Sequence, residues 1–549
     1  MSSTGIDIRA LVVLAVLTAA SVWAARAGAQ SLLPETGTTT NVEGLRQQIE
    51  GLYGIDGETG GTPAEPGWTV VPSISLVQEW TSNGGGSGSG KQQDSFITMI
   101  QPSLLVNADT NLVKGTLSWA PTASLYESSP DQNQFANNLN ANAIVTLLPE
   151  HLFLKLYGYG ALQATSGGLG PSNTTALNNE NATQTYSFGA NPYLRNRFGD
   201  LGTAEVGVAV SHTSQQGLSS QSTFLPQNLS PDQSLNSIRE YLVLTSGPTL
   251  GRTTVVVNAS ANQMSGSGVS NGAYRNVATV DVGYAITRTI TPLVTVGYED
   301  LYYATVPAYR VDDAIWKVGM RWAPNPDTML VLRYGHQDGR NGPTFNGSYA
   351  LTARLRLYGS YSEGLSSPLQ SLSDALQSSV LDPLGNPIDP ATNAPLQLSS
   401  NFFGVQSNNI LYWVKRGSLT ATLLFDRDAV SVGVSYQSQQ SVGVSVNTFG
   451  ITGASATEGT YGSVSWQHDL RPDLKATAYF LYGRSNDTVG AIPFGTIQQS
   501  AATFAGSLSL TYRFGPTLVG LVQYSYSSQS STGLNTPASL VLVGLRKTF

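Results

Sequence analysis

The sequence predicts an all-β fold, a large antiparallel transmembrane β-barrel of about 22 strands (roughly 20 to 24) with short periplasmic turns and long extracellular loops. Three observations predict this class. Apolar and polar side chains alternate over segments of about ten residues, and tight turns alternate with long polar connections. The chain also ends on an aromatic residue, Phe549, within one of the alternating segments.

Alternation is clearest in the middle of the chain. There, apolar residues on one phase of a predicted strand oppose polar residues and glycine on the other: Trp316, Val318, Met320 and Trp322 against Lys317, Gly319 and Arg321. Tight connections such as 324–327 and 514–516 are separated by Gly-, Ser-, Asn- and Gln-rich stretches such as 165–183 and 214–234. Outer-membrane barrels keep short turns in the periplasm and long loops outside. The pattern therefore predicts a barrel over residues 67–549 with both ends in the periplasm.

Residues 1–29 have the pattern of a secretory signal peptide. Arg9 supplies a positive start, residues 10–24 are apolar, and the sequence Ala-Gly-Ala at 27–29 fits the small-residue cleavage rule. A transmembrane anchor is the weaker alternative, because the apolar run is short for a bilayer span. No later segment is apolar and long enough for a membrane helix. We therefore expect export through the general secretory route to the outer membrane of a Gram-negative envelope.

The composition agrees with a barrel and excludes several classes. Hydrophobic residues make up 40% and charged residues 11%, with 57 Gly, 25 Tyr and no Cys. A soluble domain of this size would carry roughly twice the charge. The absence of cysteine excludes a disulfide scaffold, thiolate chemistry and acylation at a lipoprotein-type cysteine. A net charge of −7 without basic clusters argues against a nucleic-acid partner.

Two segments fall outside the predicted strands. In the leader, residues 30–66, four apolar residues recur at helical spacing: Val42, Leu45, Ile49 and Leu52. They predict a short amphipathic helix over 40–55 that would plug the lumen or dock a periplasmic partner, and a loosely ordered leader is the alternative. The proline-rich loop over 364–408 either folds inward as a constriction or remains solvated at the surface.

Charged residues fall on the inward phase of the predicted strands. On the lipid face near mid-bilayer a basic residue would cost roughly 2–4 kcal/mol, so we expect these residues to line the lumen. The candidates are Lys114, Arg252, Asp281, Glu299, Lys317, Arg321, Arg333, Arg354 and Arg356. Opposed rows of charge orient ions or polar polymers in a pore. The basic row would consist of Arg321, Arg333, Arg354 and Arg356, and the acidic row facing it of Asp281 and Glu299. The alternative is that these residues form structural ion pairs within the lumen.

The last strand predicts contacts with membrane and machinery. Val543, Leu545 and Phe549 share its lipid-facing phase, and such an ending is the signal read by the barrel-insertion machinery. Other aromatic residues precede connections and predict girdles at the headgroup level: Trp322, Trp466 and Phe514 before short turns, and Tyr302 and Tyr303 before a long loop. Carbohydrate stacking is the alternative for the two tyrosines.

The sequence predicts no catalytic, cofactor or metal site. The four histidines, at positions 151, 212, 336 and 468, form no cluster with metal-ligand spacing. No glycine-rich phosphate loop follows a strand into a helix. We therefore expect a protein that is not an enzyme.

Several segments resemble one known family. They are residues 71–83 (VPSISLVQEWTSN), 94–104 (DSFITMIQPSL), 318–324 (VGMRWAP), 332–335 (LRYG) and 358–363 (YGSYSE). They are similar to the outer-membrane barrel proteins associated with PEP-CTERM/exosortase systems, over most of residues 68–549. That family often has Tyr-Thr-Asp-Asn where residues 80–83 read Trp-Thr-Ser-Asn. It accompanies exopolysaccharide production and has no agreed functional residues, so the resemblance implies polymer export or surface assembly, with polysaccharide or periplasmic export components as partners.

Two functions follow from these observations. The first is a passive or gated outer-membrane channel or assembly component linked to exopolysaccharide export. The second is a structural or adhesive barrel whose long loops bind partners, without transport. A TonB-dependent receptor shares the strand number but needs a plug domain, for which residues 30–66 are too few. The sequence leaves open the cargo and whether the lumen is open or plugged.

Overall fold

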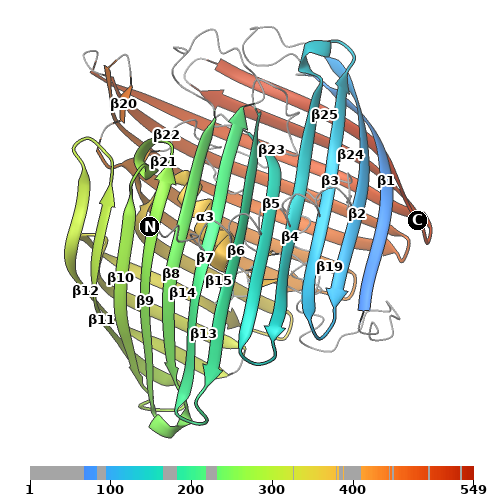
Figure 1. Ribbon diagram of the computed structural model, residues 1–549. Coiled ribbons are helices and arrows are strands. Elements are labelled where there is room, and N and C mark those ends of the chain that lie inside the picture. Colours follow the sequence, from blue (N-terminus) through green and yellow to red (C-terminus); the bar gives the residue numbers. More distant parts are fainter. Residues whose placement is uncertain are drawn as a thin grey trace, which may run out of the picture.

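A computed structural model describes residues 67–82, 94–164, 182–217, 232–325, 327–378, 380–381, 387–388, 410–443, 445–447, 450–491, 495–531 and 534–549. They form a closed antiparallel barrel of 22 strands, which confirms the predicted fold class and strand number (Figure 1). The predicted signal peptide (1–29) and leader (30–66) lie outside the described residues. Among those described, no helix combines the length and apolar character needed to cross a membrane.

The barrel strands follow one another along the chain, and each pairs with the next. In order they are β1 (Gly67–Thr81), β2 (Ser95–Asp109), β3 (Val113–Tyr126), β4 (Gln134–Leu148), β5 (Leu152–Ala164), β6 (Ala182–Arg197), β7 (Gly202–Gly217), β8 (Gln233–Ser246), β9 (Thr253–Gly266), β10 (Tyr274–Tyr284), β11 (Ile290–Tyr303), β12 (Tyr309–Asn325), β13 (Thr328–Gln337), β14 (Arg340–Ala350), β15 (Leu355–Ser366), β18 (Tyr412–Leu424), β19 (Asp428–Ser441), β21 (Gly450–Arg471), β22 (Leu474–Ala491), β23 (Gly495–Gly515), β24 (Leu518–Ser531) and β25 (Leu534–Thr548).

Three short strands lie in the connections between barrel strands. β20 (Ser445–Asn447) pairs with the start of β21, and β16 (Val380–Leu381) pairs with β17 (Pro387–Ile388) in a separate ladder. One helix, α3 (Pro368–Ser378), follows β15.

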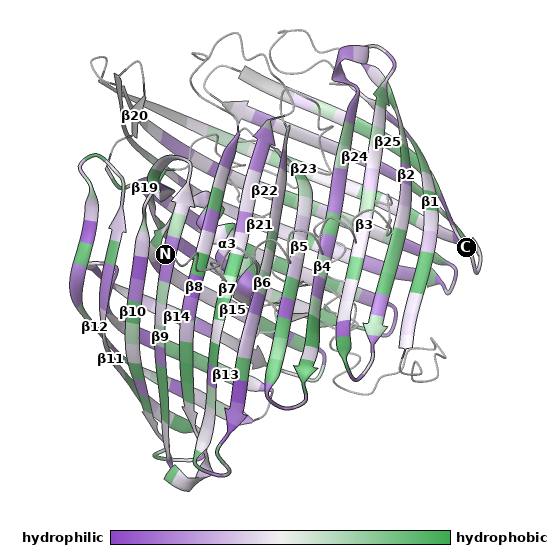
Figure 2. Cartoon of the chain, viewed as in Figure 1, coloured by the Kyte–Doolittle hydropathy of each residue, from purple (hydrophilic) through white to green (hydrophobic). Residues whose placement is uncertain are grey.

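The strands form because each of them satisfies its backbone groups on its neighbours while presenting an apolar face outward. In lipid no water pairs with exposed N–H and C=O groups, so a spanning sheet must close on itself. Figure 2 shows hydrophobic and hydrophilic residues alternating along the strands. On β12, for example, Trp316, Val318 and Met320 are exposed on the outer face, whereas Val311 and Ile315 face inward and are buried.

The barrel closes between its first and last strands. β25 pairs with β1 from Ser73↔Thr548 to Thr81↔Leu540. Val543, Leu545 and Phe549 are exposed on the outer side of this seam. Lys547 shares their phase at the end of the strand, where its Nζ donates a hydrogen bond to Thr517 Oγ1 at 2.6 Å. A lysine there extends along the apolar surface and keeps its charged head in a polar environment.

The two ends of the barrel differ in their connections. One end, which we call the short-turn end, holds Gly67 and Phe549 and connections no longer than 247–252, between β8 and β9. The opposite, long-loop end includes the connection 367–411 between β15 and β18. Connections 338–339, 492–494 and 532–533 at that end are tight as well, so the predicted strict alternation of tight and long is wrong there. The two strands that flank residues 492–494, β22 and β23, are long, with 18 and 21 residues.

Candidate functional site in the barrel lumen

Part of the long connection after β15 enters the lumen. α3 lies inside the barrel and packs against β6, β7 and β8 (Figure 1). Pro368 begins the helix, where its missing N–H costs nothing, and Ser367 Oγ accepts a hydrogen bond from Gln370 N at 3.4 Å. For this part of the loop over 364–408, the structure shows the first of the two predicted alternatives, in which the loop folds into the lumen and does not remain solvated at the surface. Residues 389–408, the last part of the predicted loop, lie outside the described residues.

Three leucines on α3 anchor it to two regions of the wall. Leu369 is buried in a cluster that draws on β8, β9, β11, β12, β15 and β18: Leu235, Met264, Leu301, Tyr303, Val311, Leu365 and Trp413 are among its members. Leu372 and Leu376 pack against Tyr157 and Tyr159 of β5. Burying such a side chain contributes roughly 1.5–3 kcal/mol relative to leaving it exposed. The helix is thus held by packing across the inside of the barrel.

Polar contacts fix the helix along its length. Tyr303 on β11 donates a hydrogen bond to Gln370 Oε1 at 2.8 Å. Further along, the Ser373 and Ser211 hydroxyls lie 3.0 Å apart. At the helix end, Lys155 Nζ on β5 donates to the carbonyl oxygen of Gln377 at 2.7 Å. A cation there compensates the partial negative charge of the last helical carbonyls. These bonds set the depth at which the helix sits.

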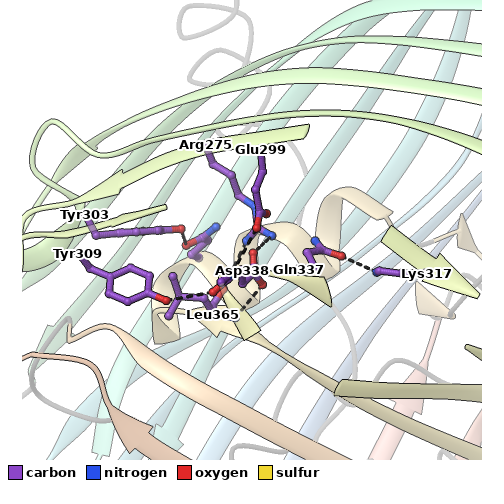
Figure 3. A network of polar contacts seen from close by, with 10 residues as sticks. Arg275, Glu299, Tyr303, Tyr309, Lys317, Gln337, Asp338 and Leu365 are labelled. Atoms are coloured by element: carbon purple, nitrogen blue, oxygen red, sulfur yellow. Dashed lines mark hydrogen bonds and ion pairs between the residues drawn. The ribbon is translucent and has the colours of Figure 1, made fainter. Parts of the chain in front are cut away.

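A buried ion pair holds the point from which the chain turns into the lumen (Figure 3). Arg275 on β10 contacts Asp338 Oδ1 at 2.5 Å, with side chains that are 19% and 5% exposed. Asp338 Oδ2 accepts a hydrogen bond from the Leu365 backbone N–H at 3.1 Å, and Asp338 O accepts one from the Tyr309 hydroxyl at 3.0 Å. The turn from β13 to β14 is thereby tied to the end of β15.

The conformation of that turn follows from its sequence. Asp338 and Gly339 have φ of 58° and 75°. An Asp-Gly pair is preferred where both central residues of a tight hairpin need positive φ. The turn places the Gly339 N–H 3.3 Å from Glu299 Oε1 and follows Gln337, whose Oε1 lies 2.5 Å from Lys317 Nζ. Glu299 and Lys317, two predicted lumen residues, therefore belong to this network.

Other predicted lumen residues form ion pairs with close partners. Arg333 on β13 contacts Asp281 on β10, and it also donates to Thr295 Oγ1 at 2.9 Å. Arg356 on β15 is 9% exposed and lies 3.4 Å from Asp327. In these pairs a cation and an anion neutralise each other locally, which corresponds to the alternative of structural ion pairs.

The remaining candidates lie near the short-turn end. Lys114 forms an exposed pair with Asp109 at 3.1 Å, and Arg321 is exposed on the inward phase of β12. Arg252 and Arg354 were expected on strands, but they lie in the turns before β9 and β15 and are exposed, so their assignment to the lumen wall is wrong. Arg354 pairs with Asp426 of a neighbouring turn at 3.1 Å. β9 starts at Thr253 and β15 at Leu355, each one residue later than the alternation predicts, because the preceding arginine belongs to the turn.

The predicted aromatic girdle is wrong at one position. Tyr302 stacks on Tyr274 with ring centroids 5.9 Å apart, but Tyr303 is fully buried in the lumen against α3. Consecutive residues of a strand point to opposite faces, so two adjacent tyrosines do not both reach the lipid headgroups. Strand geometry alone was sufficient to exclude that prediction.

Sequence reasoning missed the residues that hold α3. Lys155, Tyr157, Ser211 and Asp338 were not among the candidates. Two local signals were present: the leucines after Pro368 have helical spacing, and Asp338 begins an Asp-Gly turn. The contacts across the lumen leave no local trace in the sequence.

The closed barrel, its apolar outer surface and its polar interior define the class: this is a β-barrel of the outer-membrane type. No protein-family model and no curated protein matches the chain. Similar solved structures include the FrpB iron transporter from Neisseria meningitidis (F5-1 variant), at 10% identity and a TM-score of 0.48, over 87% of this chain and 82% of that chain. The siderophore receptor PiuA from Acinetobacter baumannii is 9% identical with a TM-score of 0.45, over 87% and 82%. Similarity at this level assigns no activity, ligand or partner to this chain.

Proposed function

We propose that this protein is an outer-membrane channel whose lumen is narrowed by α3. One observation carries the proposal: an eleven-residue helix is fixed inside the barrel by buried leucines and by hydrogen bonds to three strands. A constriction on a rigid wall selects what passes through a pore. A barrel that serves only as an adhesive scaffold has no need of a helix held at this depth.

The proposal includes an orientation, a route and a role. The short-turn end faces the periplasm, as in other outer-membrane barrels, so α3 descends from the outer surface. The chain reaches the membrane through the general secretory route, and the insertion machinery recognises β25 through Val543, Leu545 and Phe549. The protein has no catalytic activity in this proposal.

Conductance in planar bilayers tests the channel. Purified full-length protein is compared with a variant in which residues 368–378 are replaced by a Gly-Ser segment of equal length. We expect the variant to conduct more current per channel, because the helix no longer occupies part of the cross-section. A control replaces residues 127–133, a described connection at the long-loop end that does not belong to α3, and is expected to leave the current unchanged. If neither the natural protein nor the variant ever conducts, the scaffold function replaces the channel.

The cargo is a finer proposal. The resemblance to the PEP-CTERM-associated barrels supports a polysaccharide, exported together with periplasmic components. Polysaccharide-synthesis genes beside the gene for this chain would support that cargo. A neighbourhood without such genes would favour the structural or adhesive barrel over export.

A further inference from the structure

Five arginines at the short-turn end carry charges that no neighbouring side chain neutralises. Each is exposed, and none forms an ion pair or a side-chain hydrogen bond within the part of the chain that the structure describes. They are Arg252, Arg288, Arg321, Arg427 and Arg513. Arg321 and Arg513 lie on the inward phase of β12 and β23, whereas the other three lie in turns. A guanidinium presents five N–H donors and no acceptor, so such a group calls for an anion.

The acidic side chains at this end are mostly paired. Six form ion pairs: Asp109 with Lys114, Glu205 with Arg195, Asp281 with Arg333, Asp327 with Arg356, Asp426 with Arg354 and Asp473 with Arg471. Two more have polar neighbours: Asp428 beside Trp466 and His468, and Asp469 opposite Lys475 on the β21–β22 ladder. Glu150, Asp200 and the carboxyl terminus remain. Among the described residues of this end, free arginines therefore outnumber free acids.

The long-loop end has the opposite balance over the described residues. Asp94, Glu127 and Asp312 are exposed there, and none of them forms an ion pair within the described ranges. Charges of one sign around an opening raise the local concentration of ions of the other sign. An anionic solute is therefore attracted to the short-turn mouth and not to the opposite one.

Backbone hydrogen bonds bring three of the five arginines onto adjoining elements. Ala285 N donates to Arg252 O at 2.8 Å, which joins the turn before β9 to the turn that contains Arg288. Ala323 N donates at 2.8 Å to the carbonyl oxygen of the residue after Arg288, which joins that turn to the end of β12, where Arg321 lies. Neighbouring strands are about 4.8 Å apart, so one ligand with several charges reaches all three side chains.

We propose that the short-turn mouth binds a solute with several carboxylate or phosphate groups, held by Arg321 and Arg513 inside the mouth and by the three turn arginines at its rim. Arginine pairs with either group through two parallel N–H···O bonds. A phospholipid headgroup offers the same chemistry, but lipid contacts the outward phase of a strand and Arg321 and Arg513 lie on the inward one. The inference rests on the proposed channel, because it names the charge of what the channel takes up from the periplasm.

Fluorescence anisotropy of labelled decaglutamate, titrated with the full-length protein in a non-ionic detergent, measures this binding. We expect Arg321→Gln combined with Arg513→Gln to weaken it about fivefold, since each exposed ion pair is worth up to a few-fold in affinity. The charge-neutral control combines Arg354→Gln with Asp426→Asn. It removes a paired arginine together with its partner at the same end and should leave the binding unchanged. Heat-modifiable migration on gels verifies that each variant folds.

A lipid arm separates a solute from a headgroup. Phosphatidylglycerol is added to the micelles, and the natural protein is compared with the Arg321/Arg513 variant and with a variant that combines Arg252→Gln, Arg288→Gln and Arg427→Gln. For a solute site, we expect decaglutamate binding that persists with the lipid and depends on Arg321 and Arg513. Displacement of decaglutamate by the lipid, with only the turn variant weakened, assigns the arginines to headgroups and overturns the inference.

Current recordings separate this inference from the channel proposal. Decaglutamate added to a conducting channel is expected to block it at lower concentration than neutral dextran of equal size. Conduction without decaglutamate binding, or binding that the Arg321/Arg513 variant leaves unchanged, overturns the inference and leaves the channel intact. Binding that depends on these two arginines in a protein that never conducts overturns the channel and supports the site.

Discussion

At the scale of single residues, the Arg275–Asp338 pair connects the barrel wall to the helix in its lumen. Both side chains are largely shielded from water, and the Asp338 carboxylate also accepts the Leu365 N–H. Removing one member of a buried pair leaves an uncompensated charge, whereas an exposed pair is worth little. The two kinds of pair in this protein are therefore expected to respond differently to mutation.

We expect Arg275→Met to lower the free energy of unfolding by about 3–5 kcal/mol, because it leaves Asp338 buried without its cation. Urea unfolding in detergent micelles, followed by tryptophan fluorescence, measures the change. Lys114→Met is the control, and since the Lys114–Asp109 pair is exposed it should change the value by less than about 1 kcal/mol. Equal effects of the two substitutions would contradict the role assigned to the buried pair.

A second prediction at this scale concerns Gly483. Its missing side chain makes room for the Tyr461 ring, so Gly483→Ala forces the ring or the strand to move and should cost about 1–3 kcal/mol. Gly462→Ala is a matched control one strand away, since nothing lies within 4 Å of a Cβ there. The same urea titration compares them. A Gly483→Ala variant as stable as the Gly462→Ala variant would show that the ring does not need this space.

At the scale of elements, α3 contains a single acidic residue, Asp374, whose protonation state affects how the helix docks. Burial raises the pKa of this carboxyl above its ordinary value, an effect that the positive charges of Arg239 and Arg275 partly offset. In an undocked helix the carboxyl would return to an ordinary pKa of about 3.9. Protonation therefore favours the docked helix. The stabilisation of the docked helix by protonation of Asp374 is complete below the ordinary pKa of the carboxyl. It is lost as the pH rises through the raised pKa of the docked state.

Acidification is consequently expected to hold α3 more firmly and to reduce the frequency of large-conductance openings. Single-channel recordings between about pH 4 and pH 7 measure the effect. Asp374→Asn removes the titrating group, so its openings should vary less with pH than those of the natural protein. An identical pH profile in the two proteins would assign the titration to another group.

The sequence indicated the elements unevenly. The alternation over residues 316–322 lies within β12, which extends further at both ends, whereas the turns before β9 and β15 took Arg252 and Arg354 out of the strands. A terminal residue of a strand obeys turn geometry as much as it obeys the apolar pattern. For α3 the helical spacing was present within a loop that also contained several prolines, and nothing local indicated whether that helix would face water or the lumen.

At the scale of the whole molecule, closure between β1 and β25 is testable because the chain contains no cysteine. Gln78 and Val543 are directly opposite each other across the seam. Facing residues of antiparallel strands lie about 4.5–5.5 Å apart, within the range a disulfide requires. We expect Gln78→Cys with Val543→Cys to form a disulfide in the folded protein. The disulfide should raise the free energy of unfolding by at most about 5 kcal/mol.

A shifted pair serves as the control. Leu545 faces Leu76, so Gln78 and Leu545 are diagonal neighbours, two residues out of register. Their Cα atoms are about 7–8 Å apart, too far for a disulfide, so Gln78→Cys with Leu545→Cys should remain reduced. Gel mobility under non-reducing conditions distinguishes the two variants. Disulfide formation by the shifted pair but not by the facing pair would place the strands in a different register.

The sequence by itself determined the barrel. Lipid forces the backbone groups within the bilayer to pair within the sheet and favours apolar side chains on the outward phase, so the sequence of each strand records the requirement locally, as far as the last strand and Phe549. The tertiary structure alone decided what fills the lumen. Arg333 meets Asp281 only through strand register, and Lys155 meets the Gln377 carbonyl across 222 residues of sequence. Such contacts depend on how the walls curve toward one another, which no local pattern of residues records.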